Sequence, residues 1–220
     1  MGMIVRVDSW QSNHRIRSLF AIALLRFGFR KIPGLEFYKI LGTGKGETFT
    51  LNDADPTHWV LLTTWTNEIH EQVNSHLFVR TLNSIARSHR QLLLRPISTR
   101  GTWARVTPFD VQSPQNPAAS IAVITRARIK VRWWRYFYSQ VPPVIMDLQQ
   151  ADGLLERFGI GEAPIGLQGT FSIWKNHDAI KKFAYQTTSH QAVIQQTSKL
   201  DWYSEELFAR FEILSDQEVS

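Results

Sequence analysis

The hydrophobic and polar positions of this chain form two successive series of short apolar runs, separated by polar signals that begin helices. Runs of strand length, rich in β-branched and aromatic residues, alternate with segments whose apolar positions recur every three to four residues. Asn67 and Asn176 each follow such a run and are good helix N-caps, with acidic residues in the next turn. The first series predicts strands and helices over residues 4–7, 13–29, 59–65, 67 onward and 92–106, and the second over 121–129, 132–140, 169–174, 176 onward and 207–213.

Both series also carry glycines at matching places. Gly34 precedes Gly42-Thr43-Gly44, and Gly153 precedes Gly159-Ile160-Gly161, which we interpret as corners. The order strand-helix-strand-strand-helix-strand therefore occurs twice, as in the ferredoxin-like motif. Between the copies, three prolines fall in a stretch with the composition of a linker. We predict an α+β chain with a first ferredoxin-like βαββαβ repeat over 1–106, a linker over 107–119 and a second repeat over 120–220.

A ferredoxin-like sheet has helices on one face only, so its other face needs a partner. A second copy in the same chain can provide it by closing a barrel, and the space between the two sheets is then a natural ligand cavity. Strand alternation over 121–129 puts Ile121, Val123 and Thr125 on one side and Ile124 and Arg126 on the other. One of these rows is expected to face the cavity.

The amino-acid composition limits the partners and the kinds of catalytic or metal site that this chain can have. The 220 residues include 25 Lys and Arg against 19 Asp and Glu, which gives a basic surface suited to anionic partners. Cysteine is absent, so disulfides, cysteine-ligated iron–sulfur clusters and cysteine nucleophiles are excluded, and the seven histidines are the strongest metal ligands available. Lack of cysteine is compatible with the cytoplasm. The start of the chain reads as a strand, and no apolar run reaches about 18 residues, so we expect a soluble or peripheral protein.

Several common site motifs do not occur. The run Gly42-Thr43-Gly44-Lys45-Gly46 lacks the spacing of a phosphate-binding loop, and we interpret it as a turn. No serine-hydrolase elbow or zinc-protease pattern is present. The aromatic signature of an RNA-recognition sheet is missing as well, so nucleic acid is not an expected partner.

Several segments together resemble one family over nearly the whole chain. They are residues 36–46, Thr125-Arg126-Ala127, Gly159-Ile160-Gly161-Glu162 with Pro164, residues 170–174, and residues 202–211. In register, they resemble spheroidene monooxygenase, the acyclic carotenoid ketolase. The resemblance implies a dimeric α+β barrel type of fold and a haem cofactor. It also implies a role in carotenoid biosynthesis, in which molecular oxygen and electrons from reduced ferredoxin oxidise an allylic methylene of an acyclic carotenoid to a ketone.

The chain departs from the family pattern after the first repeat. The family typically has Gly-x-Trp followed by an acid and Gly, whereas this chain has Gly101-Thr102-Trp103-Ala104-Arg105. It also ends near Ser220 without a second such motif. The identity of the substrate is therefore open.

His190 is the histidine that matches one in the family, and the resemblance makes it the expected axial iron ligand. Thr187, Thr188 and Ser189 can cap a helix beginning at His190, and a helix N-terminus disfavours protonation of the imidazole. A neutral imidazole can bind iron. A capping or core histidine is the structural alternative, and His177 and the other five histidines are weaker candidates.

The remaining site residues follow from the expected barrel. Arg126 is the candidate for binding haem propionates, because a guanidinium binds a carboxylate through two N–H groups; the alternative is a solvated basic strand. Phe171, Trp174, Phe183 and Tyr185 are the candidates to line an apolar substrate pocket, with ordinary core packing as the alternative.

A basic segment with an apolar middle, residues 14–31, is the candidate for peripheral contact with the inner membrane, against packing on its own sheet. Two other functions stay open: a different haem enzyme on the same barrel, such as an aldoxime-dehydratase-like catalyst, and a non-catalytic barrel that binds a hydrophobic ligand. The sequence also leaves a homo-oligomer open.

Overall fold

The structure is a computed structural model of the 220-residue chain. It describes residues 2–25, 29, 32–46, 53–66, 69–137, 139, 147–148, 150–162, 167–186 and 202–219.

Two successive sets of elements follow the predicted order of strands and helices. The first set consists of β1 (Ile4–Ser12), α1 (Arg15–Leu25), β2 (Leu35–Gly44), β3 (Ala54–Trp65), η3 (Ile69–Ser75), α2 (Leu77–Ile85) and β4 (Ala86–Gly101). The second set consists of β5 (Ile121–Ile129), η4 (Val131–Trp133), β6 (Leu154–Gly161), β7 (Leu167–Trp174), α4 (His177–Gln186) and β8 (Tyr203–Val219). Among the described residues, every helix is too short or too polar to cross a bilayer.

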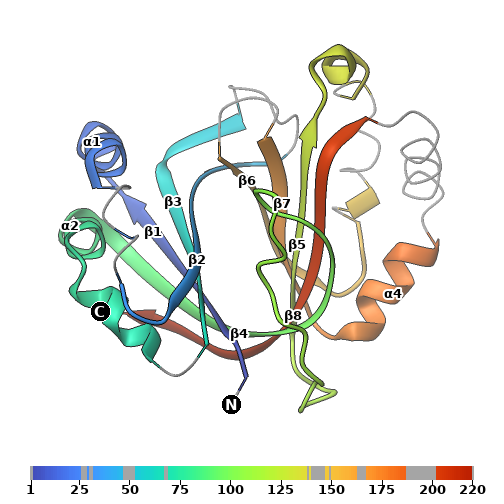
Figure 1. The fold of residues 1–220 in the computed structure, drawn as a ribbon. Helices are drawn as coiled ribbons and strands as arrows, with labels where there is room; N and C mark the ends of the chain where they lie inside the picture. Colours follow the sequence, from blue (N-terminus) through green and yellow to red (C-terminus); the bar gives the residue numbers. More distant parts are fainter. Residues whose placement is uncertain are drawn as a thin grey trace.

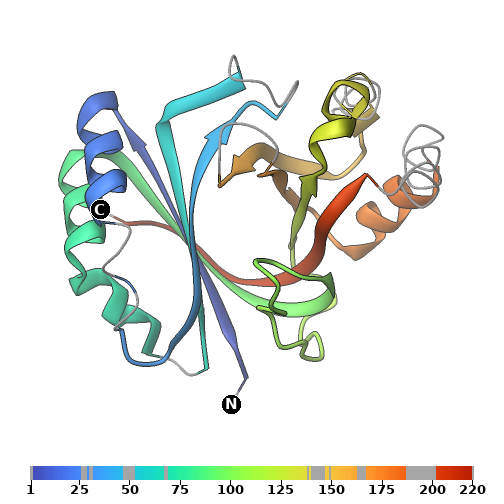
Figure 2. The ribbon, with the colours of Figure 1, turned by 45° about the horizontal axis from the view of Figure 1, so that its top comes forward.

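The eight strands form one closed barrel in the order β1-β3-β2-β6-β7-β5-β8-β4. Figures 1 and 2 show the two sets on opposite sides of this barrel, with α1 and α2 outside the first set and α4 outside the second. Two antiparallel pairings join the sets: a long one between β4 and β8, and a short one between β2 and β6. The predicted α+β class, with two ferredoxin-like repeats forming a barrel within one chain, is confirmed. The residue boundaries of the two repeats stay a prediction.

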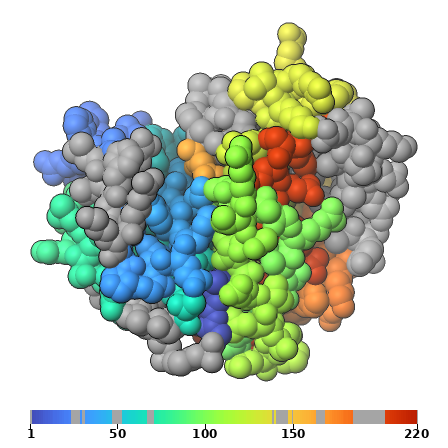
Figure 3. Space-filling model, viewed as in Figure 1, coloured from blue at the N-terminus to red at the C-terminus, as the bar shows by residue number. Residues whose placement is uncertain are grey.

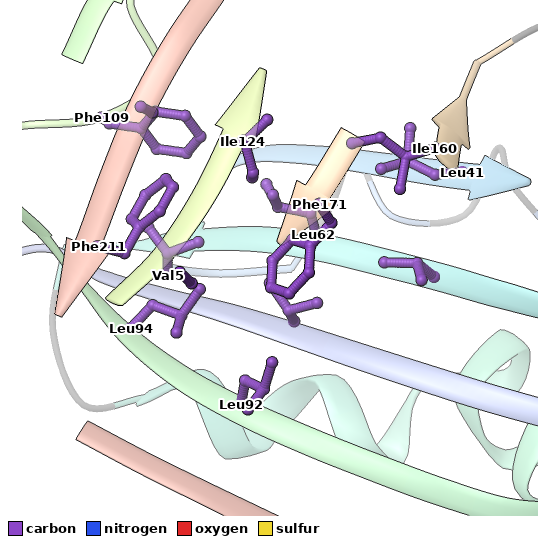
Figure 4. Packing of buried hydrophobic residues seen from close by; sticks show 14 of the residues in the cluster. Val5, Leu41, Leu62, Leu92, Leu94, Phe109, Ile124, Ile160, Phe171 and Phe211 are labelled. Carbon is purple, nitrogen blue, oxygen red and sulfur yellow. The ribbon is translucent and has the colours of Figure 1, made fainter. Parts of the chain in front are cut away.

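Alternation along the strands separates an interior core from two outer cores. Side chains from all eight strands, together with Trp103 and Phe109, fill the interior, and the buried members of this cluster are 5% exposed or less. Figure 4 shows members of this cluster, among them Val5, Phe171 and Phe211, directed toward one another. A second cluster lies between the first set's sheet and α1 and α2, and a third lies between β5, β7 and α4. The barrel is therefore a packed core with helices on its outer surface.

Of the glycines interpreted as corners, Gly34 and Gly153 lie in turns with positive φ values of 78° and 83°, whereas the others lie on paired strands. Gly42 pairs with Gly161 and Gly44 pairs with Gly159, so the two glycine groups form the short β2–β6 seam. Backbones come close just beyond it, since a Cβ built on Gly159 would lie 3.0 Å from the Cα of Gly46. For these strand glycines the corner interpretation was wrong, because glycine also marks a strand position where another backbone approaches closely.

We expect Gly46→Ala to destabilise the barrel by about 1–3 kcal/mol. Gly46 has a φ of +65°, and its added Cβ would lie 2.9 Å from the backbone nitrogen of Gly159. Both atoms are fixed to the backbone, so neither can move away without distorting the paired strands. Gly42→Ala is the matched control on the same seam, because its Cβ would make an ordinary 3.5 Å contact with the Trp59 ring. Urea unfolding measures both, and equal stability of the two variants would contradict the steric role of the seam.

Strand ends are the main difference from the expected boundaries. β4 spans Ala86–Gly101 and β8 spans Tyr203–Val219, where the apolar runs predicted 92–106 and 207–213. These two strands pair from His89↔Val219 to Gly101↔Leu207. Their backbone hydrogen bonds therefore extend both strands beyond the apolar runs into polar residues. The helix expected after Asn67 also differs: α2 follows η3, and its N-cap is His76, whose side chain accepts from the Phe78 amide.

Candidate functional site

Five side chains from separate parts of the chain meet at one end of the barrel interior. Lys39 comes from β2, Arg126 from β5 and Glu205 from β8, while Trp103 follows β4 and Glu162 follows β6. Arg126 shares the inward row of β5 with Ala122 and Ile124, which belong to the interior cluster. We term this group the Arg126 cluster.

Arg126 is the centre of the cluster and is 3% exposed. Its Nε and Nη2 donate to Glu162 Oε1 at 3.0 and 2.7 Å, and its Nη1 donates to Glu205 Oε2 at 2.6 Å. Lys39 Nζ donates to the other oxygen of Glu162 at 2.5 Å, and the guanidinium lies 5.3 Å from the Trp103 ring centroid. Two positive and two negative charges therefore balance in a largely buried site.

Trp103 reaches the cluster through a tight turn. Its backbone N–H donates to the Val106 carbonyl at 2.8 Å, and its indole Nε1 donates to Glu162 Oε1 at 2.7 Å. Ala104 and Arg105 have positive φ values of 56° and 67°, a backbone region that favours glycine. The departure from the family pattern therefore places Arg105, at some backbone cost, where the family typically has glycine.

Both carboxyl groups are stabilised in their ionised form. Burial raises the pKa of Glu162, but the hydrogen bond and charge of Lys39, with Arg126 and the Trp103 indole, outweigh burial and lower the pKa below its ordinary value. Burial likewise raises the pKa of Glu205, and the Arg105 backbone N–H together with Arg126 lowers it overall. Both carboxyl groups are therefore ionised at neutral pH.

This arrangement predicts a loss of stability in acid. A carboxyl whose folded-state pKa is lowered contributes fully above its unfolded value of about 4.3 and loses that contribution as pH falls through the folded value. We expect the free energy of unfolding to fall below about pH 4 and to fall less steeply in Glu162→Gln. Urea unfolding at several pH values measures this, with Glu218→Gln at an exposed site of β8 as the control. An unchanged pH dependence in Glu162→Gln would contradict the prediction.

Ion pairs also close the opposite end of the barrel. Arg90 on β4 donates from Nη1 to Glu156 Oε2 on β6 at 2.6 Å and from Nε to Asp216 Oδ1 on β8 at 2.7 Å. Because β4 and β6 lie on opposite sides of the closed strand order, the Arg90–Glu156 pair crosses the opening. Beside these groups lies a cavity of about 270 Å³, with Leu155, Ile173 and Ile213 as its apolar walls.

The predicted site residues lie in different places. Phe171 belongs to the interior cluster, whereas Trp174 and Phe183 pack on each other between β7 and α4, with ring centroids 5.4 Å apart. Tyr185 belongs to α4, but its side chain lies outside the described residues, as does all of His190. The structure thus brings Arg126 and Phe171 into the same interior and places Trp174 and Phe183 on the outer face of the sheet.

Similarity to known proteins covers most of the chain. It is 33% identical over 190 residues to spheroidene monooxygenase of Rhodobacter capsulatus, which covers 84% of this chain and 78% of that protein. It is 32% identical over 189 residues to the protein of the same name from Rubrivivax gelatinosus, covering 85% and 72%. The chain belongs to the spheroidene monooxygenase family. The relative from Cereibacter sphaeroides is 30% identical over 193 residues, but this chain spans only 59% of its length.

Solved structures share the fold of this spheroidene monooxygenase family member at low identity. Two crystal structures of aldoxime dehydratase, one in complex with butyraldoxime, align over 96% and 99% of this chain with TM-scores of 0.61 and 0.63. Their sequence identities are 8% and 9%, so this likeness concerns the fold alone. No protein-family model matches the chain.

The haem that the spheroidene monooxygenase resemblance implies stays a prediction, because its expected ligand His190 lies outside the described residues. Among the described residues, the interior cluster is buried, while Phe37, Phe158 and Ile213, which pack against it, are only partly buried. His58 enters the interior from β3, but its Nε2 lies 2.6 Å from Ser9 Oγ and its ring packs on Phe158. Within the described ranges, no three His, Asp or Glu side chains form a metal site.

Sequence reasoning missed four members of the Arg126 cluster: Lys39, Trp103, Glu162 and Glu205. Three of them lie in segments that carry the family resemblance, and Trp103 lies in the departing motif. A usable signal was available, because charged residues at inward positions of strands must find partners of opposite charge. Glu162 was assigned to a corner, so its position directly after β6, at the barrel interior, was not recognised.

Proposed function

We propose that this chain is a monooxygenase that oxidises an acyclic carotenoid or a similarly long, apolar polyene. The observation that carries the proposal is its similarity, over most of its length, to three proteins named spheroidene monooxygenase. The fold agrees with this assignment, but fold alone does not determine chemistry. The substrate class comes from the names of these relatives.

The proposed reaction converts an allylic methylene next to the carotenoid end group into a ketone. One O₂, two electrons and two protons insert the first oxygen, giving an alcohol and one water. A second identical insertion at the same carbon gives a geminal diol and another water. The diol then loses water to form the ketone. Reduced ferredoxin is the proposed electron donor, and the net charge of +6 suits an acidic protein partner.

Haem with His190 as its axial ligand is the proposed cofactor, on the strength of the family resemblance. The described residues do not include His190, so no place in the barrel is assigned to the cofactor. The described residues contribute an apolar core and ion pairs at both ends of the barrel. No step of the reaction is assigned to them.

The test is turnover by purified protein from cells supplied with haem. The assay contains a methoxy-carotenoid, NADPH, ferredoxin reductase and ferredoxin, and mass spectrometry follows replacement of two hydrogens by one oxygen. Under ¹⁸O₂ the product ketone should carry label when extraction is fast enough to limit exchange with water. Omission of ferredoxin or O₂ should stop the reaction. Haem-loaded protein that leaves the carotenoid unchanged would reject this substrate.

The aldoxime dehydratase fold supplies the second candidate function. Removal of water from an aldoxime consumes neither O₂ nor external electrons, so nitrile formation under anaerobic conditions without ferredoxin would favour it. Protein that binds a carotenoid, lacks haem absorption and converts neither substrate would instead indicate a non-catalytic barrel.

A further inference from the structure

Helix α1 exposes an apolar stripe to solvent. Ile16 is 74% exposed, Leu19 47% and Phe20 64%. These positions are three and four residues apart, so their side chains lie on one face of the helix, and exposed Ala23 continues the stripe by one turn. In Figures 1 and 3, α1 lies at the outer edge of the first set of elements, away from the barrel.

The stripe is not the surface that attaches α1 to the protein. Ser18 and Ala21 are buried, and Ala21 with Ile22 packs in the cluster between the helices and the sheet. These residues lie on the helix face opposite Ile16 and Phe20. Three large apolar side chains therefore lie on a surface that does not pack against the protein's own core.

Positive charge surrounds this stripe. Arg15 and Arg17 are exposed, and by helical geometry they flank it on its two sides. The sequence from 13 to 31 contains five Lys and Arg residues and no acidic residue. Apolar side chains between basic flanks are the pattern of a helix that lies in the interface of an anionic membrane.

We propose that α1 docks this protein onto an anionic lipid surface, with Ile16, Leu19 and Phe20 inserted between headgroups and Arg15 and Arg17 on lipid phosphates. A second copy of this chain is the less suitable occupant, because a two-fold interface places a patch against itself and would bring like charges together. The inference goes beyond the proposed function. Its test contains no substrate, so it can fail or succeed independently of the reaction.

The experiment is co-sedimentation of the purified protein with vesicles of phosphatidylcholine alone or with one third phosphatidylglycerol. We expect binding to the anionic vesicles, weakened by high salt and at least tenfold weaker on phosphatidylcholine. Ile16→Ser/Phe20→Ser should lower the partition onto anionic vesicles at least tenfold. Arg15→Gln/Arg17→Gln should lower it about tenfold at low salt.

Two matched controls lie away from α1. Val111→Ser removes an apolar side chain that is 53% exposed, and Arg100→Gln removes an arginine whose side chain is 84% exposed. Both should bind vesicles like the wild type, and circular dichroism checks that every variant is folded. Equal vesicle binding by Ile16→Ser/Phe20→Ser and the wild type would overturn the proposal. So would absence of wild-type binding, or a dimer in sedimentation velocity that the double substitution abolishes without any effect on vesicles.

Discussion

Replacing Arg126 with alanine is expected to lower the free energy of unfolding by about 3 kcal/mol, near the lower end for breaking a buried ion pair. The substitution leaves Glu162 and Glu205 without their shared guanidinium, although Glu162 keeps Lys39 and Glu205 keeps the Arg105 amide. Trp103 also loses the nearer of two cations that lie over its ring, and it keeps Lys39. Denaturant unfolding at neutral pH, followed by tryptophan fluorescence, measures the loss.

Arg128→Ala is the matched control, two residues further along the same strand. The Arg128 side chain is 48% exposed and lies 4.0 Å from Glu205, so its loss should cost about 1 kcal/mol or less. In Arg126→Ala/Glu162→Gln/Glu205→Gln, both carboxylates become neutral, and part of the stability should return. If Arg126→Ala is as stable as Arg128→Ala, the ion-paired role is wrong.

These variants also separate the structural role of Arg126 from the expected role in binding haem propionates. A propionate partner would change haem affinity with little effect on the unfolding of haem-free protein. An ion pair that closes the barrel end would change that unfolding directly. The contacts of Arg126 with Glu162 and Glu205 favour the second outcome.

Local patterns were sufficient to predict the architecture of this chain. Apolar runs such as that in β5 and a cap such as Asn176, whose side chain accepts from the Ala179 amide, fix elements through short-range physics. The repeated order of elements then indicated the barrel. Alternation also put Arg126 in the same row as Ile124, and the structure shows that this row faces the interior.

Long-range pairings were not predictable in the same way. Nothing local to Lys39 indicates that Glu162 will neutralise it, because the two are brought together by the β2–β6 seam. The same seam explains why glycines read as turns lie in strands. Trp174 and Phe183 show that aromatic residues alone do not locate a pocket. An apolar ring is equally suited to a pocket and to the core between the sheet and α4, where these two lie.

Replacing His190 with alanine is expected to abolish both haem binding and turnover. The proposal makes this imidazole the axial ligand, and an alanine offers no atom to hold iron. The wild type purified from haem-supplied cells should show a Soret band that His190→Ala lacks, and carotenoid oxidation should fall to background. Circular dichroism and denaturant unfolding of haem-free protein should remain as in the wild type.

His58→Ala makes the test of His190 specific. Burial lowers the pKa of His58, so its imidazole is neutral at neutral pH and is chemically able to bind a metal. However, its ring is held by Ser9 and packs on Phe158 within the filled interior. His58→Ala should therefore keep the Soret band. If the band disappears in His58→Ala and persists in His190→Ala, the ligand assignment is wrong. If the wild type shows no band under any haem supply, the haem proposal fails, while membership of the family stands on sequence similarity.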